Sequence, residues 1–277
     1  LADRLLPKKY FAAHHLSLQL TPSFNLGIFE TVVFARENQF EFQYLNPIIL
    51  YRSVEGAIGS PDNVLIGIDL KWDMFKRISI YGQFILDEFK LNELTSANGW
   101  WANKYGLQLG ARYFDAFSIP FLDLQVEYNS IRPYTYSHND STANYSHYNQ
   151  SLAHPLSSNL REVLLRLNYQ PHPRVTLRFH SMFAITGEDP TGENWGSNLL
   201  LLNQNREQDF GNEIGQGIAT DINLFGFDVS YRLKPGFYID LYQQRRMKAS
   251  AEPTRELNTR YWGMAVRWNL SRTRLEF

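Results

Sequence analysis

The residues best suited to chemistry lie in one predicted loop, Asn129–Leu160, which mixes tyrosine, histidine, asparagine and serine. Such side chains offer flat apolar faces together with neutral hydrogen-bond donors and acceptors. Sugars present hydroxyl groups and C–H patches, so this composition favours contact with a glycan. The candidate ligand residues are Tyr134, Tyr136, His138, Tyr145, His147, Tyr148, Asn149 and His154. The alternative is a loop that folds back on the protein and uses its tyrosines for packing.

The spacing of polar residues predicts neither a catalytic nor a metal site. The three histidines of the loop form no HxH or HExxH pattern, and the sequence has no GxSxG, P-loop or GxGxxG motif. Asp87 and Glu88, near Glu93, are candidates for acid–base work on a glycoside. Adjacent carboxylates on a strand point to opposite faces, so they cannot act as a pair. We therefore expect no enzyme activity, no cofactor and no metal.

Composition excludes further classes of protein. The chain has 277 residues, a net charge of -1 and no Cys, which rules out disulfides and Cys-ligated metal sites. A nearly neutral balance argues against nucleic acid as a partner, because phosphate contacts need a basic excess. With 44% hydrophobic residues the chain can bury a large surface, which argues against disorder.

Most of the chain alternates apolar and polar residues with a period of two. In Phe121–Tyr128 (FLDLQVEY), Leu122, Leu124 and Val126 share one face, and the charged residues share the other. Because successive side chains of a strand point to opposite faces, this pattern predicts a strand with one apolar and one polar face.

Eleven segments follow this pattern, at residues 10–20, 24–35, 64–72, 76–86, 104–114, 120–128, 161–169, 174–185, 221–231, 236–245 and 258–270. A tilted strand that crosses a bilayer needs roughly 9–11 residues, whereas strands of globular sheets most often have about 5–6. The predicted strands match the longer class. The sequence therefore predicts an all-β fold, an antiparallel transmembrane β-barrel of the bacterial outer membrane, as a single domain over residues 1–277.

The connections between these strands alternate in length. Short turns such as Thr21–Ser23 and Leu233–Pro235 alternate with long loops at residues 36–63, 87–103, 129–160, 186–220 and 246–257. Outer-membrane barrels have short periplasmic turns and longer extracellular loops. We therefore expect the long loops at the cell surface and the apolar faces against outer-membrane lipid.

The end of the chain bears on strand number. A terminal aromatic residue, Phe277, after an amphipathic strand resembles the assembly signal of bacterial outer-membrane proteins. A bulge near Ser271–Thr273 would bring Phe277 into register with the apolar positions before it. If the last strand runs toward the periplasm, eleven strands place Leu1 outside the cell, whereas single-chain barrels normally have an even count. We expect an odd number of further strands before Leu1; the alternative is one more strand within Gln39–Tyr51.

The polar faces would line the interior of such a barrel, and they carry charges of both signs. The predicted interior network consists of Arg77, Arg112, Asp123, Glu127, Glu162, Arg166, Arg174 and Arg178. Enclosed charges must be paired or hydrated, so mixed signs predict cross-strand ion pairs and a plugged or narrow interior. The alternative is that these charges only solvate the wall.

Several motifs resemble Wzi-type capsule assembly proteins. They are YGQFI at Tyr81–Ile85, the tyrosine and histidine motifs within Glu127–Leu156, and AHHLS at Ala13–Ser17 with NLGIFE at Asn25–Glu30. LNPIILYR at Leu45–Arg52 and GSPDN at Gly59–Asn63 are similar to the branch that includes gliding-motility surface proteins. The resemblance covers roughly residues 10–170.

The resemblance implies a large outer-membrane barrel with a non-enzymatic role in attaching capsule or exopolysaccharide to the cell surface, with the external loops as the glycan contact. The motility branch implies a barrel subunit of a larger secretion or motility complex, with other outer-membrane proteins as partners. A diffusion pore or transporter is the third interpretation, since the lumen could be open.

Overall fold

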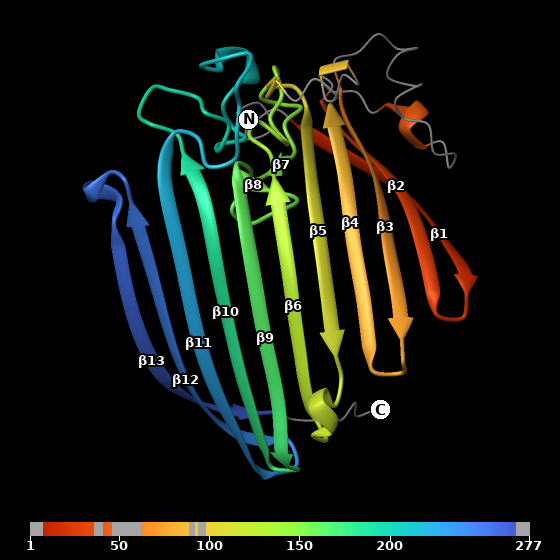
Figure 1. The fold of residues 1–277 in the computed structure, drawn as a ribbon, viewed down its shortest axis with the longest axis vertical. Helices are drawn as coiled ribbons and strands as arrows, with labels where there is room; N and C mark the ends of the chain where they lie inside the picture. Colours follow the sequence, from red (N-terminus) through yellow and green to blue (C-terminus); the bar gives the residue numbers. More distant parts are fainter. Residues whose placement is uncertain (1–7, 36–40, 46–61, 89–91, 94–97, 270–277) are drawn as a thin grey trace, which may run out of the picture.

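A computed structural model of the chain describes residues 8–35, 41–45, 62–88, 92–93 and 98–269. Eleven long strands form one antiparallel sheet, in the order β1-β2-β3-β4-β5-β6-β9-β10-β11-β12-β13 (Figure 1). A small hairpin of β7 and β8, within the connection from β6 to β9, forms a second sheet. Within the described residues, the edge strands β1 and β13 each pair with one neighbour.

The strands are β1 (Lys9–Thr21), β2 (Phe24–Ala35), β3 (Asn63–Met74), β4 (Ile78–Glu88), β5 (Lys104–Tyr113), β6 (Leu122–Ile131), β7 (Ser146–His147), β8 (Gln150–Ser151), β9 (Leu160–His172), β10 (Val175–Glu188), β11 (Ile218–Lys234), β12 (Phe237–Ser250) and β13 (Leu257–Trp268). Short 3-10 helices are η2 (Phe42–Leu45), η3 (Ala116–Ser118), η4 (Asn203–Asn205) and η5 (Pro253–Arg255). No helix in the described part of the chain is long and apolar enough to cross a membrane.

All eleven predicted strands are confirmed, and with them the antiparallel all-β fold. Several strands extend further toward the long loops than predicted: β6 continues to Ile131, β11 begins at Ile218 and β12 continues to Ser250. The register continues through these extensions, since Thr220 still faces Ser250. Polar residues such as these carry no apolar alternation, so the hydropathy pattern ends before the hydrogen-bonded ladder does.

The prediction of a long loop at residues 246–257 is wrong in extent. Strand β12 occupies residues up to Ser250 and β13 begins at Leu257, which leaves the connection 251–256 with η5 inside it. This connection is shorter than the 114–121 connection between β5 and β6, so the strict alternation of loop length fails there. The described residues 98–103, 132–159 and 189–217 of the other long connections gather at one end of the sheet, and the tight turns lie at the opposite end (Figure 1).

Two further expectations concern segments near the ends of the described ranges. Phe42–Leu45 forms the 3-10 helix η2, so the described part of the predicted additional strand, within Gln39–Tyr51, is not a strand. The predicted bulge at Ser271–Thr273 and the terminal Phe277 lie outside the described residues. The expectation of further strands before Leu1 stays a prediction.

One face of the sheet is apolar and exposed across many strands. Ile68, Leu109, Val126, Phe227 and Trp262 on this face expose between 46% and 81% of their surface. No second layer of described residues covers them. Because water-soluble proteins rarely expose contiguous apolar patches larger than a few hundred Å², a face of this extent marks contact with lipid or with another protein.

The opposite face is polar, and on it rings occupy the space above glycines of the neighbouring strand. Tyr81 faces Gly110 across the pair β4–β5, and a Cβ added at Gly110 would lie 2.2 Å from the Cζ of Tyr81. The same cross-strand relation pairs Phe29 with Gly67, His180 with Gly226 and Tyr242 with Gly263. We refer to this face as the polar wall.

Candidate functional site

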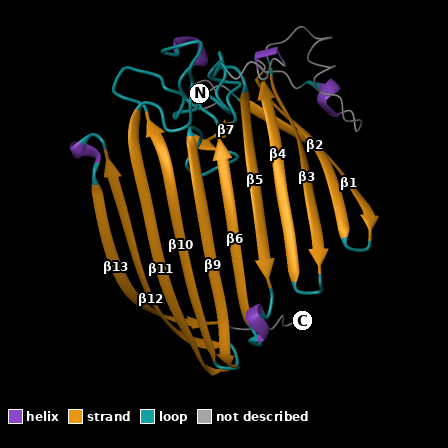
Figure 2. Cartoon of the chain, in the orientation of Figure 1, coloured by secondary structure: helices purple, strands orange, loops and turns teal. Residues whose placement is uncertain are grey.

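Three connections fold together at the loop end of the sheet, and we call them the cap: residues 98–103, 132–159 and 189–217 (Figure 2). Backbone hydrogen bonds join them. The amide of Tyr134 donates to the carbonyl of Gly196 at 2.9 Å, and the amide of Gly211 donates to the carbonyl of Asn98 at 2.9 Å. Each connection is therefore held by another, and the cap is one folded unit.

Tyr134 and Tyr136 form the interior of the cap and are 0% and 3% exposed. The hydroxyl of Tyr134 donates to the carbonyl of Asn194 at 2.9 Å. Tyr136 packs in an apolar cluster that includes Ile85 and Leu160 of the wall strands. Burial raises the pKa of both phenols. This arrangement matches the alternative stated above, in which the loop folds back and uses its tyrosines for packing.

His138 and Tyr145 also lie within the cap. The amide of Asp140 donates to Nδ1 of His138 at 3.1 Å. Burial, followed by the charge of nearby Lys104, lowers the pKa of His138. The ring of Tyr145 stacks on that of Tyr136 with centroids 5.8 Å apart, and burial raises its pKa. Neither His138 nor Tyr145 is presented to a large external ligand.

His147, Tyr148 and Asn149 lie at the hairpin of β7 and β8 and are exposed. Tyr148 exposes 83% of its surface. Both central residues of the turn have positive φ, 47° at Tyr148 and 59° at Asn149, as a tight two-residue hairpin turn requires. His154 is partly buried. The eight predicted ligand residues therefore divide into five that are buried or partly buried in the cap and three that are exposed at the hairpin tip, and they do not form one surface.

A pocket of about 520 Å³ opens on the cap beside this hairpin. It is lined by Asn149, Gln150, Ser151, Ala153, Pro155, Ser157, Asn198, Leu199 and Leu200, none of which is charged. Within the described part of the chain, the hydroxyl oxygens of Ser151 and Ser157 are buried without a hydrogen-bond partner. The neutral groups that this pocket offers are therefore the side chains of Asn149, Gln150 and Asn198, because these two serine hydroxyls are closed off from solvent.

Sequence reasoning found one residue of this cap pocket, Asn149. Asn198 and its neighbours come from a different connection, and their approach to Asn149 depends on the fold of the cap. Asp189 fixes that segment, because its carboxylate accepts the backbone amides of Trp195 at 2.7 Å and Asn198 at 2.8 Å. No periodicity of the sequence encodes such a contact.

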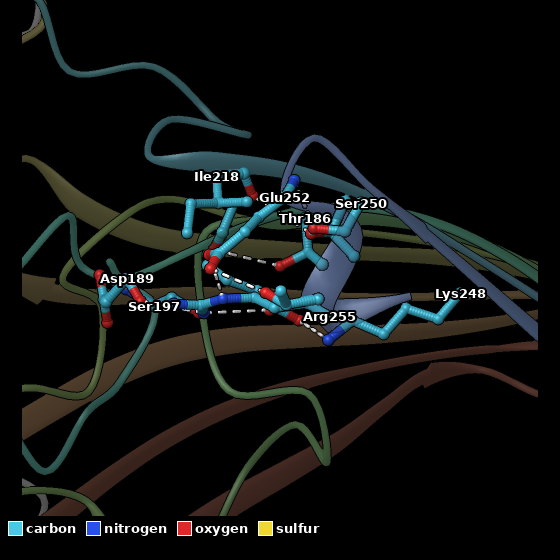
Figure 3. Close-up of polar contacts among 12 residues, drawn as sticks. Thr186, Asp189, Ser197, Ile218, Lys248, Ser250, Glu252 and Arg255 are labelled. Carbon is cyan, nitrogen blue, oxygen red and sulfur yellow. Dashed lines mark hydrogen bonds and ion pairs between the residues drawn. The ribbon is translucent and has the colours of Figure 1, made fainter. Parts of the chain in front are cut away.

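Arg255 of η5 ties the connection 251–256 to the cap (Figure 3). Its Nη1 donates to the carbonyl of Asp189 at 3.1 Å and lies 3.4 Å from Oε2 of Glu188, while its Nε donates to Glu252 at 2.7 Å. Lys248 pairs with the other oxygen of Glu188 at 2.7 Å. These contacts fix the end of β10 at Glu188, directly before the Asp189 segment begins.

The cap is anchored to the strands below it by polar contacts. Asp87 accepts the backbone amide of Tyr136 at 2.7 Å. Lys104 donates to the carbonyl of Ser137 at 3.0 Å and pairs with Glu88 at 3.4 Å. Of the two carboxylates considered above for acid–base chemistry, Asp87 thus holds the cap directly, whereas Glu88 pairs with the lysine that holds the next cap residue.

The predicted interior network is partly assembled. Asn129 donates to Glu127 at 3.1 Å and to Glu162 at 2.8 Å, and Tyr81 donates to Glu127 at 2.7 Å. Arg112 lies over the ring of Tyr81, 5.4 Å from its centroid. These residues form one hydrogen-bonded region of the polar wall below the cap.

The remaining members do not join this hydrogen-bonded region. Arg77 and Arg174 lie in short turns, Asp123 accepts the amide of Asp115 at 3.3 Å, and Arg166 and Arg178 lie on β9 and β10. Other side chains pair on this face: His15 contacts Asp69 at 2.9 Å, and Arg267 forms an ion pair with Asp240 at 3.1 Å. In the described part of the chain, no three metal-ligating side chains are grouped.

Comparisons with known proteins give a structural likeness and no match in sequence. No protein-family model matches the sequence, and no curated protein matches it. The crystal structure of the outer membrane channel DcaP of Acinetobacter baumannii aligns with a TM-score of 0.44 and 8% sequence identity over 92% of this chain. The chain spans 61% of that channel. A TM-score below 0.5 is too low to show a shared fold.

Proposed function

We propose that this chain forms the wall of a non-enzymatic outer-membrane β-barrel that binds capsule or exopolysaccharide at the cell surface. The observation that carries the membrane assignment is the exposed apolar face, which includes Leu109, Val126 and Phe227. A bilayer removes such a face from water, whereas the polar wall on the other side stays hydrated.

The polysaccharide contact is supported by the chemistry of the cap. The cap pocket offers neutral amides, and Tyr148 beside it presents a ring that is 83% exposed. Sugars bind through hydrogen bonds to hydroxyls and through stacking on aromatic faces. The motifs that resemble Wzi-type capsule assembly proteins point to the same role.

Cysteine labelling tests the membrane assignment, because the natural chain has no Cys. Tyr148→Cys places a thiol at the hairpin tip, and Lys76→Cys places one in the turn between β3 and β4. An impermeant maleimide should label Tyr148→Cys on intact cells and Lys76→Cys after the outer membrane is permeabilised. Equal labelling of both on intact cells, or recovery of the protein in the soluble fraction, rejects the membrane assignment.

Binding of purified capsular polysaccharide tests the finer role. Tyr148→Ala should weaken binding about tenfold, since stacking and hydrogen bonds are each worth on the order of 1 kcal/mol. Tyr231→Ala, on the apolar face near the short turns, is the matched control and should bind normally. Unchanged binding by Tyr148→Ala rejects the cap pocket as the contact and leaves the membrane assignment standing.

A diffusion pore is the second candidate. The observation that favours it is a hollow of about 600 Å³ on the polar wall of β1 to β5, lined by residues that include His15, Lys71 and Arg112. Conductance in planar bilayers separates the two functions. If the protein gives no conductance, it is not an open pore. If it gives a steady conductance, its interior is not sealed.

A further inference from the structure

A second hollow, of about 500 Å³, lies on the polar wall of β9, β10 and β11 and is not used by the proposed function. Its lining includes Leu164, Arg166, Arg178, His180, Met182 and Leu224. The hollow therefore combines two guanidinium groups with three apolar side chains.

The strand register brings the two arginines together. Arg178 faces Asn168 across the pair β9–β10, and His180 faces Arg166 in the same pair. Arg166 and Arg178 are therefore diagonal neighbours on one face, a position in which residues are roughly 7–8 Å apart. Arginine side chains are long enough to direct both guanidinium groups to one ligand group at that separation.

These two arginines differ from Arg267 of the same wall, which pairs with the carboxylate of Asp240 at 3.1 Å. Among the described residues, no carboxylate lies within 4.0 Å of Arg166 or Arg178, and neither guanidinium forms a hydrogen bond. Glu127 and Asp240 act on them electrostatically from further away.

Asp228 is the acid within the hollow, and it lies 3.8 Å from Nδ1 of His180. It also faces Arg178 in the register of β10 and β11 without forming an ion pair with it. The donors of both arginines thus remain available. A planar guanidinium matches the geometry of a carboxylate or phosphate through two parallel hydrogen bonds.

The apolar side chains form a row next to the arginines, on the side toward the cap. Met182 faces Leu164 on one neighbouring strand and Leu224 on the other. All three are partly buried. A ligand whose charged group rests on the arginines would place the atoms beside that group along this row.

We propose that this hollow binds an organic anion whose carboxylate or phosphate rests on Arg166 and Arg178 and whose apolar part lies against Leu164, Met182 and Leu224. The site belongs to the polar wall and does not depend on polysaccharide binding at the cap. A simple inorganic anion would contact the two arginines alone, and an uncharged apolar solute would contact the three apolar side chains alone.

Titration calorimetry on the protein in nanodiscs tests both halves, with acetate, hexanoate and the uncharged hexanamide as probes and empty nanodiscs subtracted. Hexanoate should bind at least tenfold more tightly than acetate, because it buries additional methylenes against the apolar side chains. It should also bind at least tenfold more tightly than hexanamide, which carries no charge for the arginines. Equal affinities for the three probes overturn the proposal.

Variants assign the binding to residues. Arg166→Gln and Arg178→Gln should each weaken hexanoate binding about tenfold, whereas Arg267→Gln should not, because Asp240 already holds Arg267. Met182→Gln should reduce hexanoate affinity toward that of acetate and leave acetate unchanged. Undiminished hexanoate binding by the double variant Arg166→Gln/Arg178→Gln overturns the proposal.

A measurement on the natural sequence avoids any folding defect of the variants. Phenylglyoxal modifies arginines, and mass spectrometry locates the modified positions. Hexanoate should slow modification of Arg166 and Arg178 and leave Arg112, on β5, unaffected. Absence of protection at both positions contradicts the site even if every variant fails to fold.

Discussion

Nε2 of His154 lies 2.7 Å from Oε1 of Glu162, across the boundary between the cap and strand β9. The two side chains are 13% and 3% exposed, so solvent screens this contact little. Asn129 donates to the same oxygen at 2.8 Å. The attachment of the cap is therefore continuous with the hydrogen-bonded region of the polar wall.

Loss of this contact should loosen the cap. We expect His154→Ala to cost about 1–3 kcal/mol, because Glu162 stays buried with one partner fewer. Limited proteolysis within residues 132–159 should become faster than in the unaltered protein. His147→Ala, at the exposed hairpin, is the control and should be cleaved at the original rate. Equal cleavage rates for the two variants would contradict the anchoring role.

Burial separates two tyrosines that sequence reasoning had placed in one set. Tyr134→Ala should destabilise the cap by about 3–5 kcal/mol, as expected for removing a fully buried ring. Tyr148→Ala should change stability by no more than about 0.5 kcal/mol, because its ring is exposed. Urea unfolding of protein refolded into vesicles measures both. Similar losses for the two variants would reject the packing role of Tyr134.

The two faces of the sheet should differ in their tolerance of charge. Leu109 and Gln108 are adjacent on β5 and point to opposite faces, and Gln108 donates to Glu127 at 3.0 Å. Leu109→Arg should cost about 2–4 kcal/mol if its face meets lipid. Gln108→Arg keeps a donor beside Glu127 and should cost less. Folding yield and urea unfolding in vesicles measure the stability of both variants. An equal loss of stability in the two would contradict contact between Leu109 and lipid.

The cap should weaken as the pH falls. Burial holds the pKa of His138 below its ordinary value of 6.5, so the folded cap keeps this ring neutral while the unfolded chain protonates it. Stability is therefore full above about pH 6.5 and declines as the pH drops further, because the unfolded state then binds more protons. His138→Gln should flatten this decline. Urea unfolding midpoints measured between about pH 7.5 and pH 5.5 test this prediction. If the midpoint falls with pH as steeply in the variant as in the unaltered protein, His138 does not cause the decline.

The strands could be predicted because apolar residues recur at every second position along them, on the side that forms the apolar face. FLDLQVEY in β6 is one example, and its register with β5 and β9 follows from the same alternation. The pattern failed where strand extensions are polar, as at Thr220 and Ser250. There the strands stay paired through backbone hydrogen bonds, which do not depend on the side chains and so produce no hydropathy pattern.

The candidate site in the cap was less predictable. The sequence shows which residue types the cap contains but does not show how its connections fold together. A tyrosine- and histidine-rich segment can present its rings or bury them. Tyr134 is buried because a backbone hydrogen bond to Gly196 and a hydroxyl contact with Asn194 draw it into a second connection. Both partners lie about 60 residues further along the chain, so no local pattern encodes them.

The rings that lie over glycines govern how much clear space the protein keeps on its polar side. Tyr81, His180 and Tyr242 can rest against the backbone because Gly110, Gly226 and Gly263 lack a Cβ. An alanine at any of these positions would push the ring away from the backbone of the wall. The clear space on the polar side of the sheet is thus set by its smallest residues, and enlarging them reduces that space without adding a bulky side chain.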